Sequence, residues 1–440
     1  MSAVVDFPVK PETRPYLEAV AGSPGEPEWL MQHRRRALAR FAELGFPSRH
    51  GEAWRYLDLR PLEQAPLRPL AATEVEAARA GGDPASAWPA AGLRLTLLDG
   101  RFAPELSRLG EMPATVWFGS MRDAIVRRPD LVGEALEALA ADRDQPFAAL
   151  NAGVFGDGFT LAVPEGVVVE PPIEILHLAS GRSTASFHTR SLVTLGAASR
   201  VRLVEIYTGE GRYWRNDVVA VRLARGAAID RVALVEEADA ALHLAVFDAT
   251  LGPDARLSST ALLLAGGTLR HDAVVRCQGE GARCGLYGAY LAAGRQQANF
   301  VTTLDHCAPR GETREVFKGV AADRAHGAFQ GRITVRPNAQ KVDAHMLSRN
   351  LLLGAHAAVD TKPELDIFAD DVKCSHGATV GDLDATALFY LLSRGIRRAD
   401  ARRMLIDAFL REPVDRVEPA SLRDHLLARL SARLAVLEET

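Results

Sequence analysis

Three stretches of the chain share one pattern, and this pattern decides the fold: 195-LGAASRVRL-203, 224-ARGAAIDRVAL-234 and 251-LGPDARLSSTAL-262. Each contains a short run rich in Val, Leu or Ile, a turn of Gly and small residues, and a second run. No helical pattern separates the runs, which argues against strand–helix–strand units. Short strands with glycine at the corners, repeated along the chain, are typical of a stacked β-solenoid, whose coils bury their interiors against one another.

The same texture continues from about residue 159 to about residue 380. A β-sandwich is the alternative, but the Asn-Gly and Asp-Gly signals of tight hairpins are mostly missing. A left-handed hexapeptide helix would need a stricter six-residue period. We therefore predict a mainly β protein built on a right-handed parallel β-helix over residues 156–382. A mostly helical region, 1–155, precedes it and a helical domain, 383–440, follows.

Helical signals lie on both sides of this core. Residues 27–44 form an amphipathic pattern, and we expect the arginines at 34–36 to lie on its solvated face. The Ala/Gly-rich stretch 70–92 reads as a variable helix or linker. Near the end of the chain, Asp384 is a good N-cap for a helix over 385–394. Two further amphipathic patterns follow, the last with leucines at positions 422, 426, 430, 434 and 437.

The composition bounds the function. The 440 residues are 48% hydrophobic and 25% charged, with a formal net charge of −4, which gives no electrostatic case for binding nucleic acid or an anionic membrane. No apolar run is long enough to span a membrane, and no signal peptide is evident, so we expect a cytoplasmic protein. Four cysteines are too few for a disulfide framework. No P-loop motif occurs.

The stretch 369-ADDVKCSHGATVGDLD-384 contains the most chemically suggestive residues, Cys374 and His376. On a strand, these two side chains share one face. Three interpretations stay open from the residues alone: a packed strand end, a pair of metal ligands, or a cysteine nucleophile with its base. Two ligands do not complete a tetrahedral metal site, so a metal would need further ligands from elsewhere. His306 and Cys307 are adjacent and point apart, which excludes a shared site on a strand.

Several motifs in the last third of the chain resemble the SufB/SufD family of iron–sulfur cluster assembly proteins. They are "NAQKVDA" at 338–344, "RNLLL" at 349–353, "KPELDI" at 362–367, the stretch around Cys374, and "LFYLLSRGI" at 388–396. The segment "EAWRYLDL" at 52–59 also resembles the SufD branch. The run 344–354 lacks the cysteine expected of SufB, and residues 376–379 read "HGAT" where SufB members read "HEAT".

The resemblance implies a β-helix fold and a non-catalytic scaffold role in a cytoplasmic complex. It implies pairing with SufB edge to edge and docking of the ATPase SufC; a homodimer is an option for the isolated chain. Iron or a nascent cluster would lie transiently at the SufB interface, with no cofactor bound by this chain alone. The implied metal ligands are His376 and Cys374, shared with the SufB subunit.

We expect residues 384–411 to provide the SufC-docking surface, because an unusually apolar helix there is followed by a basic rim. The proposed contact residues are Leu388, Phe389, Tyr390, Leu391, Leu392, Arg394, Met404 and Phe409. The alternative function is a β-helix enzyme of the polysaccharide-lyase type. It would use carboxylates such as Asp366, Asp370 and Asp371, but no aromatic sugar platform lies near them.

Overall fold

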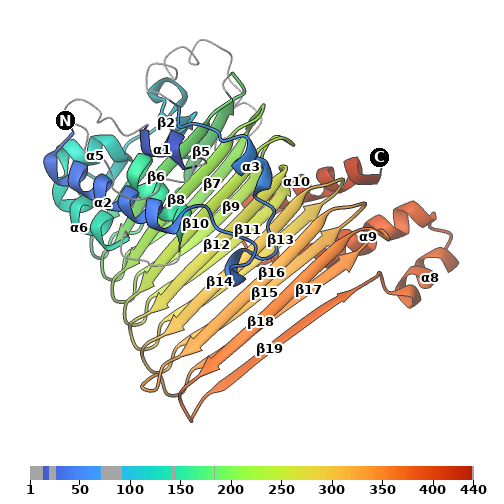
Figure 1. Cartoon of the computed structure of the whole chain (residues 1–440). Helices are drawn as coiled ribbons and strands as arrows, with labels where there is room; N and C mark the ends of the chain where they lie inside the picture. The colour runs from blue at the N-terminus through green and yellow to red at the C-terminus, as the bar shows by residue number, and fades with distance from the viewer. Residues whose placement is uncertain (1–12, 19–25, 71–91, 140–144, 183, 439–440) are drawn as a thin grey trace.

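The protein is a β-solenoid of about eight turns with helices at both ends (Figure 1). The computed structural model describes residues 13–18, 26–70, 92–139, 145–182 and 184–438. The predicted parallel β-helix is thus confirmed, and the hairpin-connected sandwich is excluded. Most of the stretch expected to be a linker, 70–92, lies outside the described residues.

Strands alternate along the chain between two sheets. The ten-stranded sheet has the order β19-β17-β15-β13-β11-β9-β7-β5-β1-β2, and the nine-stranded sheet has the order β18-β16-β14-β12-β10-β8-β6-β4-β3. The bounds are β1 Leu93–Leu98, β2 Arg101–Phe102, β3 Trp117–Ser120, β4 Phe159–Val163, β5 Ile173–Ser180, β6 Ser186–Leu195, β7 Arg200–Glu210, β8 Trp214–Leu223, β9 Ala228–Glu236, β10 Leu242–Leu251, β11 Arg256–Ala265, β12 Thr268–Cys277, β13 Arg283–Ala292, β14 Gln297–His306, β15 Glu312–Ala321, β16 His326–Val335, β17 Asp343–Leu352, β18 Ala358–Ile367 and β19 Lys373–Gly381.

From β4 onward, neighbouring strands in each sheet are parallel and lie two apart in sequence. Each coil therefore rests on the one before it. Among the named strands of the described chain, antiparallel pairing is confined to β1 with β2 and β3 with β4, at the first end of the solenoid, where an isolated antiparallel bridge also joins Arg94 and Arg108. Of these, β1, β2 and β3 extend both sheets into the region expected to be mostly helical, residues 1–155.

The corners between coils stack through backbone hydrogen bonds. One residue per corner has a positive φ, as Ala198 (56°), Gly226 (64°) and Asp254 (57°) do. The N–H groups of Ala198 and Gly226 each donate to a carbonyl of the next corner, at 2.8 Å. Gly226 therefore matches Ala198 and Asp254, not Gly196 or Gly252. The glycines that mark the repeat in the sequence occupy two different corner positions, and only this one requires the left-handed conformation.

The N-terminal helices cover the outer face of the nine-stranded sheet. They are α1 Arg14–Glu18, α2 Glu28–Leu44, α3 Arg60–Gln64, α5 Met121–Arg127, α6 Pro129–Leu139 and α7 Pro146–Val154. Aromatic side chains from this layer, including Phe147, surround Trp214 of β8. Arg34 departs from the expected solvated face: it is buried, pairs with Glu26 at 2.9 Å and donates to the Gly153 carbonyl at 3.1 Å.

The segment that contains "EAWRYLDL" links this N-terminal layer to later coils. Trp54 lies under the guanidinium of Arg270 on β12, at 3.8 Å from the ring centre. Glu52 forms an ion pair with Lys362 on β18. The Asp58 N–H donates to the Gln297 side chain at 3.0 Å. The segment thus fastens three separate coils from outside.

The C-terminal helices are α8 Ala385–Ser393, α9 Arg398–Arg411 and α10 Ala420–Glu438. The buried leucines 426, 430 and 434 of the predicted stripe pack with Ile406 and Leu410 on the outer face of the ten-stranded sheet. Leu422 is partly buried there, and the side chain of Leu437 lies outside those described. Both sheets are therefore covered on their outer faces over much of their area.

The solenoid interior is filled by close packing of large rings against glycines. Tyr290 on β13 lies over Gly319 on β15, where an added Cβ would come within 1.9 Å of the ring. Gly327 bounds the same ring from the opposite sheet, so the ring has no free space to enter.

We predict that Gly319→Ala destabilises the protein by about 1–3 kcal/mol, because overpacking a filled interior forces strain on its neighbours. Urea unfolding followed by circular dichroism measures the loss. Gly381→Ala is the matched control, since nothing lies within 4 Å of an added Cβ at that position of β19. Equal stability of the two variants would contradict this account of the packing.

Candidate functional site

The last coil leaves two full-length strands at an open end. β19 pairs only with β17 in the ten-stranded sheet, and β18 pairs only with β16 in the nine-stranded sheet. Their outer edges have no strand partner in the described chain. Unpaired edges of this length are templates for pairing with another chain unless they are blocked.

Cys374 and His376 lie on β19 and face the solenoid interior. Their register partners on β17 are Ala344 and Met346, which are buried in the interior core. No further coil of the described chain covers this layer, so His376 is exposed, whereas Cys374 is half-buried and packs against the core. The His376 side chain can therefore point toward the interior side of the sheet and still be exposed to solvent, because β19 is the last strand of the sheet.

The two groups differ in chemical state. Burial raises the pKa of the Cys374 thiol, and the thiol is therefore protonated at neutral pH. His376 forms no hydrogen bond or ion pair with any described residue, which leaves its imidazole free for an external partner. Ile367, Phe368 and Val380, in or directly after the last two strands, are exposed apolar side chains, at 42%, 61% and 40% exposure.

A second polar group joins β17 and β19 on the opposite face. His345 forms a hydrogen bond with Ser375, and its Nε2 atom lies 2.9 Å from a carboxylate oxygen of Asp343. Arg314 lowers the pKa of Asp343, which keeps that carboxylate charged. The contact with Ser375 fastens the edge strand β19 to β17.

The helix α8 stands beyond the end of β19, away from the solenoid (Figure 1). Asp384 caps it through the N–H groups of Thr386 and Ala387, as expected. Phe389 and Tyr390 are 71% and 56% exposed, and no side chain of the helix is fully buried. The other α8 residues proposed as contacts, Leu388, Leu391 and Leu392, are half-buried.

The three remaining residues of the proposed docking surface, Arg394, Met404 and Phe409, do not all face solvent. Arg394 donates to the Tyr390 hydroxyl at 2.8 Å. Met404 is 49% exposed. Phe409 instead packs against the solenoid, with the Lys318 ammonium 4.5 Å from its ring centre. Phe409 therefore serves the internal packing of α9, and α8 carries most of the available apolar surface.

The carboxylates considered for a lyase-like site do not converge. Asp366 lies 3.8 Å from Arg332, and Asp370 and Asp371 are exposed. Among the described residues, they are not part of any cluster with metal-ligand spacing.

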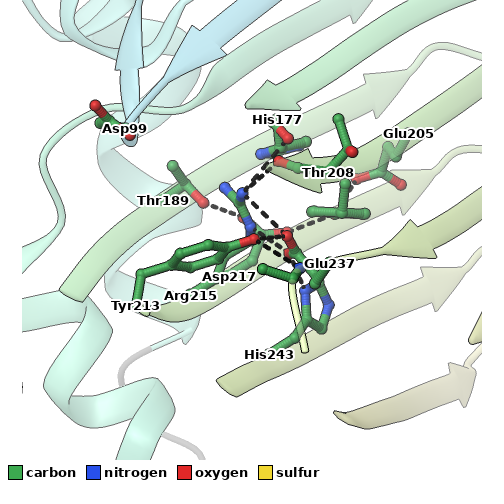
Figure 2. A network of polar contacts seen from close by, with 12 residues as sticks. Asp99, His177, Thr189, Glu205, Thr208, Tyr213, Arg215, Asp217, Glu237 and His243 are labelled. Carbon is green, nitrogen blue, oxygen red and sulfur yellow. Dashed lines mark hydrogen bonds and ion pairs between the residues drawn. The ribbon is translucent and has the colours of Figure 1, made fainter. Parts of the chain in front are cut away.

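The sequence interpretation missed a buried network of charged side chains inside the early coils (Figure 2). Arg215 forms an ion pair with Glu237 at 2.6 Å, and both side chains are fully buried. His243 and Tyr213 also contact Glu237. Burial alone would raise the pKa of Glu237, but Arg215 and His243 lower it to about 2. This carboxylate is therefore charged and well compensated.

The other half of the network is less well compensated. Arg231 pairs with Glu205, and the Tyr207 hydroxyl lies 3.0 Å from Glu205 and 2.7 Å from Asp217. Burial lowers the pKa of His177 to about 3, so this imidazole is neutral. His177 stacks on Tyr207, with ring centres 4.2 Å apart.

A single carboxyl group lies further along the interior, at Glu315 on β15. One of its oxygens accepts a hydrogen bond from Thr302 at 2.8 Å, and the other has no partner among the described residues. Burial raises its pKa from 4.5 to about 7. A buried carboxyl group without a neighbouring cation has its lowest free energy in the protonated form.

We predict that Glu315 lowers the stability of the protein as pH rises from about 4.5 to about 7. Below this window the group is protonated in both folded and unfolded chains; within it, the unfolded chain loses the proton first. The lost free energy of unfolding is roughly 3 kcal/mol by linkage, and Glu315→Gln removes it. Urea unfolding at about pH 5 and about pH 8 gives the comparison. Glu312→Gln, on the exposed face of the same strand, is the control, and profiles for the wild type and Glu315→Gln that run parallel would refute the assignment.

Comparisons with known proteins give the family. Residues 177–409 match the SUF system FeS cluster assembly SufBD core domain, and residues 91–175 match the SufBD protein N-terminal region. The chain is 30% identical to the iron-sulfur cluster assembly protein SufD of Escherichia coli, over 95% of both chains. It is 29% identical to an iron-sulfur cluster assembly SufBD family protein of Synechocystis, over 92% of this chain and 91% of that one. It is 27% identical to SufD of Bacillus subtilis over about two thirds of each chain, at 66% and 67%.

The chain therefore belongs to the SufBD family of iron–sulfur cluster assembly proteins. None of the described helices combines the length and apolar character needed to cross a membrane.

Proposed function

We propose that this chain is a non-catalytic scaffold subunit of a Suf iron–sulfur assembly complex, which pairs with SufB through its open end and docks SufC through α8. The observation that carries the proposal is the outer edge of the full-length strand β19, which has no strand partner in the described chain, together with the exposed imidazole of His376. Its relatives are named as iron–sulfur cluster assembly proteins.

The open end suits a homologous solenoid as partner. A second β-helix would supply edge strands that satisfy the free N–H and C=O groups of β18 and β19. It would also cover the exposed apolar side chains of Ile367, Phe368 and Val380. His376 would then face the junction, where neutral imidazole is a good ligand for iron and zinc. The nascent cluster is cargo in this proposal.

The thiol chemistry agrees with a reducing compartment. All four cysteines, Cys277, Cys284, Cys307 and Cys374, are free. Free thiols persist in the cytoplasm, which is the location we propose. Cys374 is a second candidate ligand, because a bound metal ion would replace the thiol proton and compensate the charge of the half-buried thiolate.

We predict that His376→Ala folds normally, since the side chain is exposed and has no partner in the described chain, but lowers cluster content in the assembled complex by more than half. Iron and acid-labile sulfide per complex, after co-expression with SufB and SufC, provide the measurement. His356→Ala, an exposed histidine before β18, is the control. Unchanged cluster content in a folded His376→Ala complex would reduce this residue to a packed strand end.

We predict that replacing Phe389 and Tyr390 by Ser weakens SufC binding by about thirtyfold or more, as expected for the loss of aromatic anchors worth ~2 kcal/mol. Point substitutions are preferable to truncation after Val380, because α9 and α10 cover the ten-stranded sheet. Val126→Ser on α5, where the side chain is 73% exposed, is the matched control. Calorimetric titration with SufC measures the affinity, and an unchanged affinity in the double variant would show that SufC docks elsewhere than on α8.

A further inference from the structure

His177, Glu205 and Asp217 converge inside the early coils, far along the solenoid from the open end. They come from β5, β7 and β8, so both sheets contribute. All three are buried, and one potential ligand atom of each lies within 4.8 Å of the others. Figure 2 shows His177, Glu205 and Asp217 around the same interior space.

Among the described residues, one carboxylate beside this space lacks an ion-pair partner of its own. The carboxylates of Glu205, Asp217 and Glu237 face the guanidinium groups of Arg215 and Arg231, and the His243 imidazole also contacts Glu237. Arg231 pairs with Glu205, and Arg215 pairs with Glu237. In the described chain, Asp217 has no ion-pair partner. A buried carboxylate without a compensating cation is costly, and Asp217 is the carboxylate of this cluster that lacks one.

The hydrogen bonds are also one proton short. The Tyr207 hydroxyl lies within hydrogen-bonding distance of both Glu205 and Asp217, at 3.0 and 2.7 Å. A tyrosine hydroxyl has one hydrogen to donate, so only one of these contacts can be a hydrogen bond from Tyr207. Thr189 donates to the other oxygen of Asp217. The remaining oxygen–oxygen contact needs a proton on a carboxyl group or a cation beside it.

His177 supplies the observation that distinguishes a cation from a proton. Both of its ring nitrogens are buried and have no hydrogen-bond partner among the described residues. A proton on Glu205 or Asp217 would repair the carboxylate contacts but would leave this imidazole unsatisfied. A metal ion between the three side chains would satisfy the carboxylates and the imidazole lone pair together.

We propose that His177, Glu205 and Asp217 bind a divalent first-row transition-metal ion, with the Tyr207 oxygen beside it. One imidazole nitrogen with two carboxylate oxygens is a donor set suited to zinc, iron or manganese. The ion ties the two sheets together inside the early coils and has a structural role. It is separate from the open end, and it does not depend on the function proposed for His376.

The test uses Zn²⁺ as the probe in the full-length, untagged chain. The parent carries Cys374→Ser and His376→Ala, which removes ligands at the open end. Because the three ligands are buried, metal enters during folding, so the protein is expressed in zinc-supplemented medium and dialysed against a weak chelator. We expect about one equivalent of retained zinc per chain by mass spectrometry, as for a closed structural site. Absence of retained zinc in the parent overturns the proposal.

Two substitutions and one control locate the ion. His177→Phe keeps the ring stacked on Tyr207, and Asp217→Asn keeps the size of the side chain; each is expected to lose the zinc. His33→Phe is the control, because His33 is also buried with both ring nitrogens unpartnered among the described residues, but lies outside the cluster. Retention of zinc by folded His177→Phe overturns the proposal.

If both variants fail to fold, anomalous diffraction at the zinc edge from crystals of the parent decides. A peak among His177, Glu205 and Asp217 supports the site, and a peak elsewhere refutes it.

Discussion

Every coil of this solenoid buries its interior only against the coils on either side, and this constraint shapes the whole molecule. The first end meets it with short antiparallel strands: β2 has two residues and β3 has four, and helices pack against Trp117 of β3. Very short, covered edges offer little template for another chain. The far end ends in strands of ten and nine residues, with no such cover in the described chain. The two ends therefore differ: in the described chain, the stack of coils ends at β18 and β19 with long strand edges that neither short strands nor helices cover.

The interior itself changes character along the axis. The last coils are filled mainly by apolar side chains such as Phe317, Phe329 and Met346, whereas the early coils hold ion pairs between fully buried side chains. Breaking one partner of a buried ion pair is costly, so each charged group constrains its neighbours strongly. The polar cluster therefore specifies how the first strands of the two sheets face each other. In the apolar coils, close packing of complementary side chains fixes the strand positions instead, as the contact between Tyr290 and Gly319 illustrates.

The sequence was sufficient to predict the solenoid, because short strands and glycine corners need only local patterns. It was not sufficient to find the buried network. A strand covered by helices outside and by its own core inside is buried on both faces, so alternation does not reveal which polar residues point inward. On β7, Val204 and Ile206 face the C-terminal helices, while Glu205 and Tyr207 face the interior. Arg34 was misjudged for a related reason: its partners, Glu26 and Gly153, come together only in the folded layer. The interior direction of Cys374 and His376 followed from alternation, but the exposure of His376 depends on the absence of a following coil.

One column of interior side chains runs through the ten-stranded sheet to the open end of the solenoid. Arg231, Ser259, Leu286, Glu315, Met346 and His376 occupy successive positions of one interior column in the ten-stranded sheet. In every coil but the last, the side chain at this position is held between those of the coils before and after it. His376 has a neighbour on one side only. A strand that paired in parallel register with β19 would place its own residue next in the column, directly against the imidazole. The same residue type that would be an inert interior group one coil earlier is thus chemically available here, and its availability comes from where the stack ends.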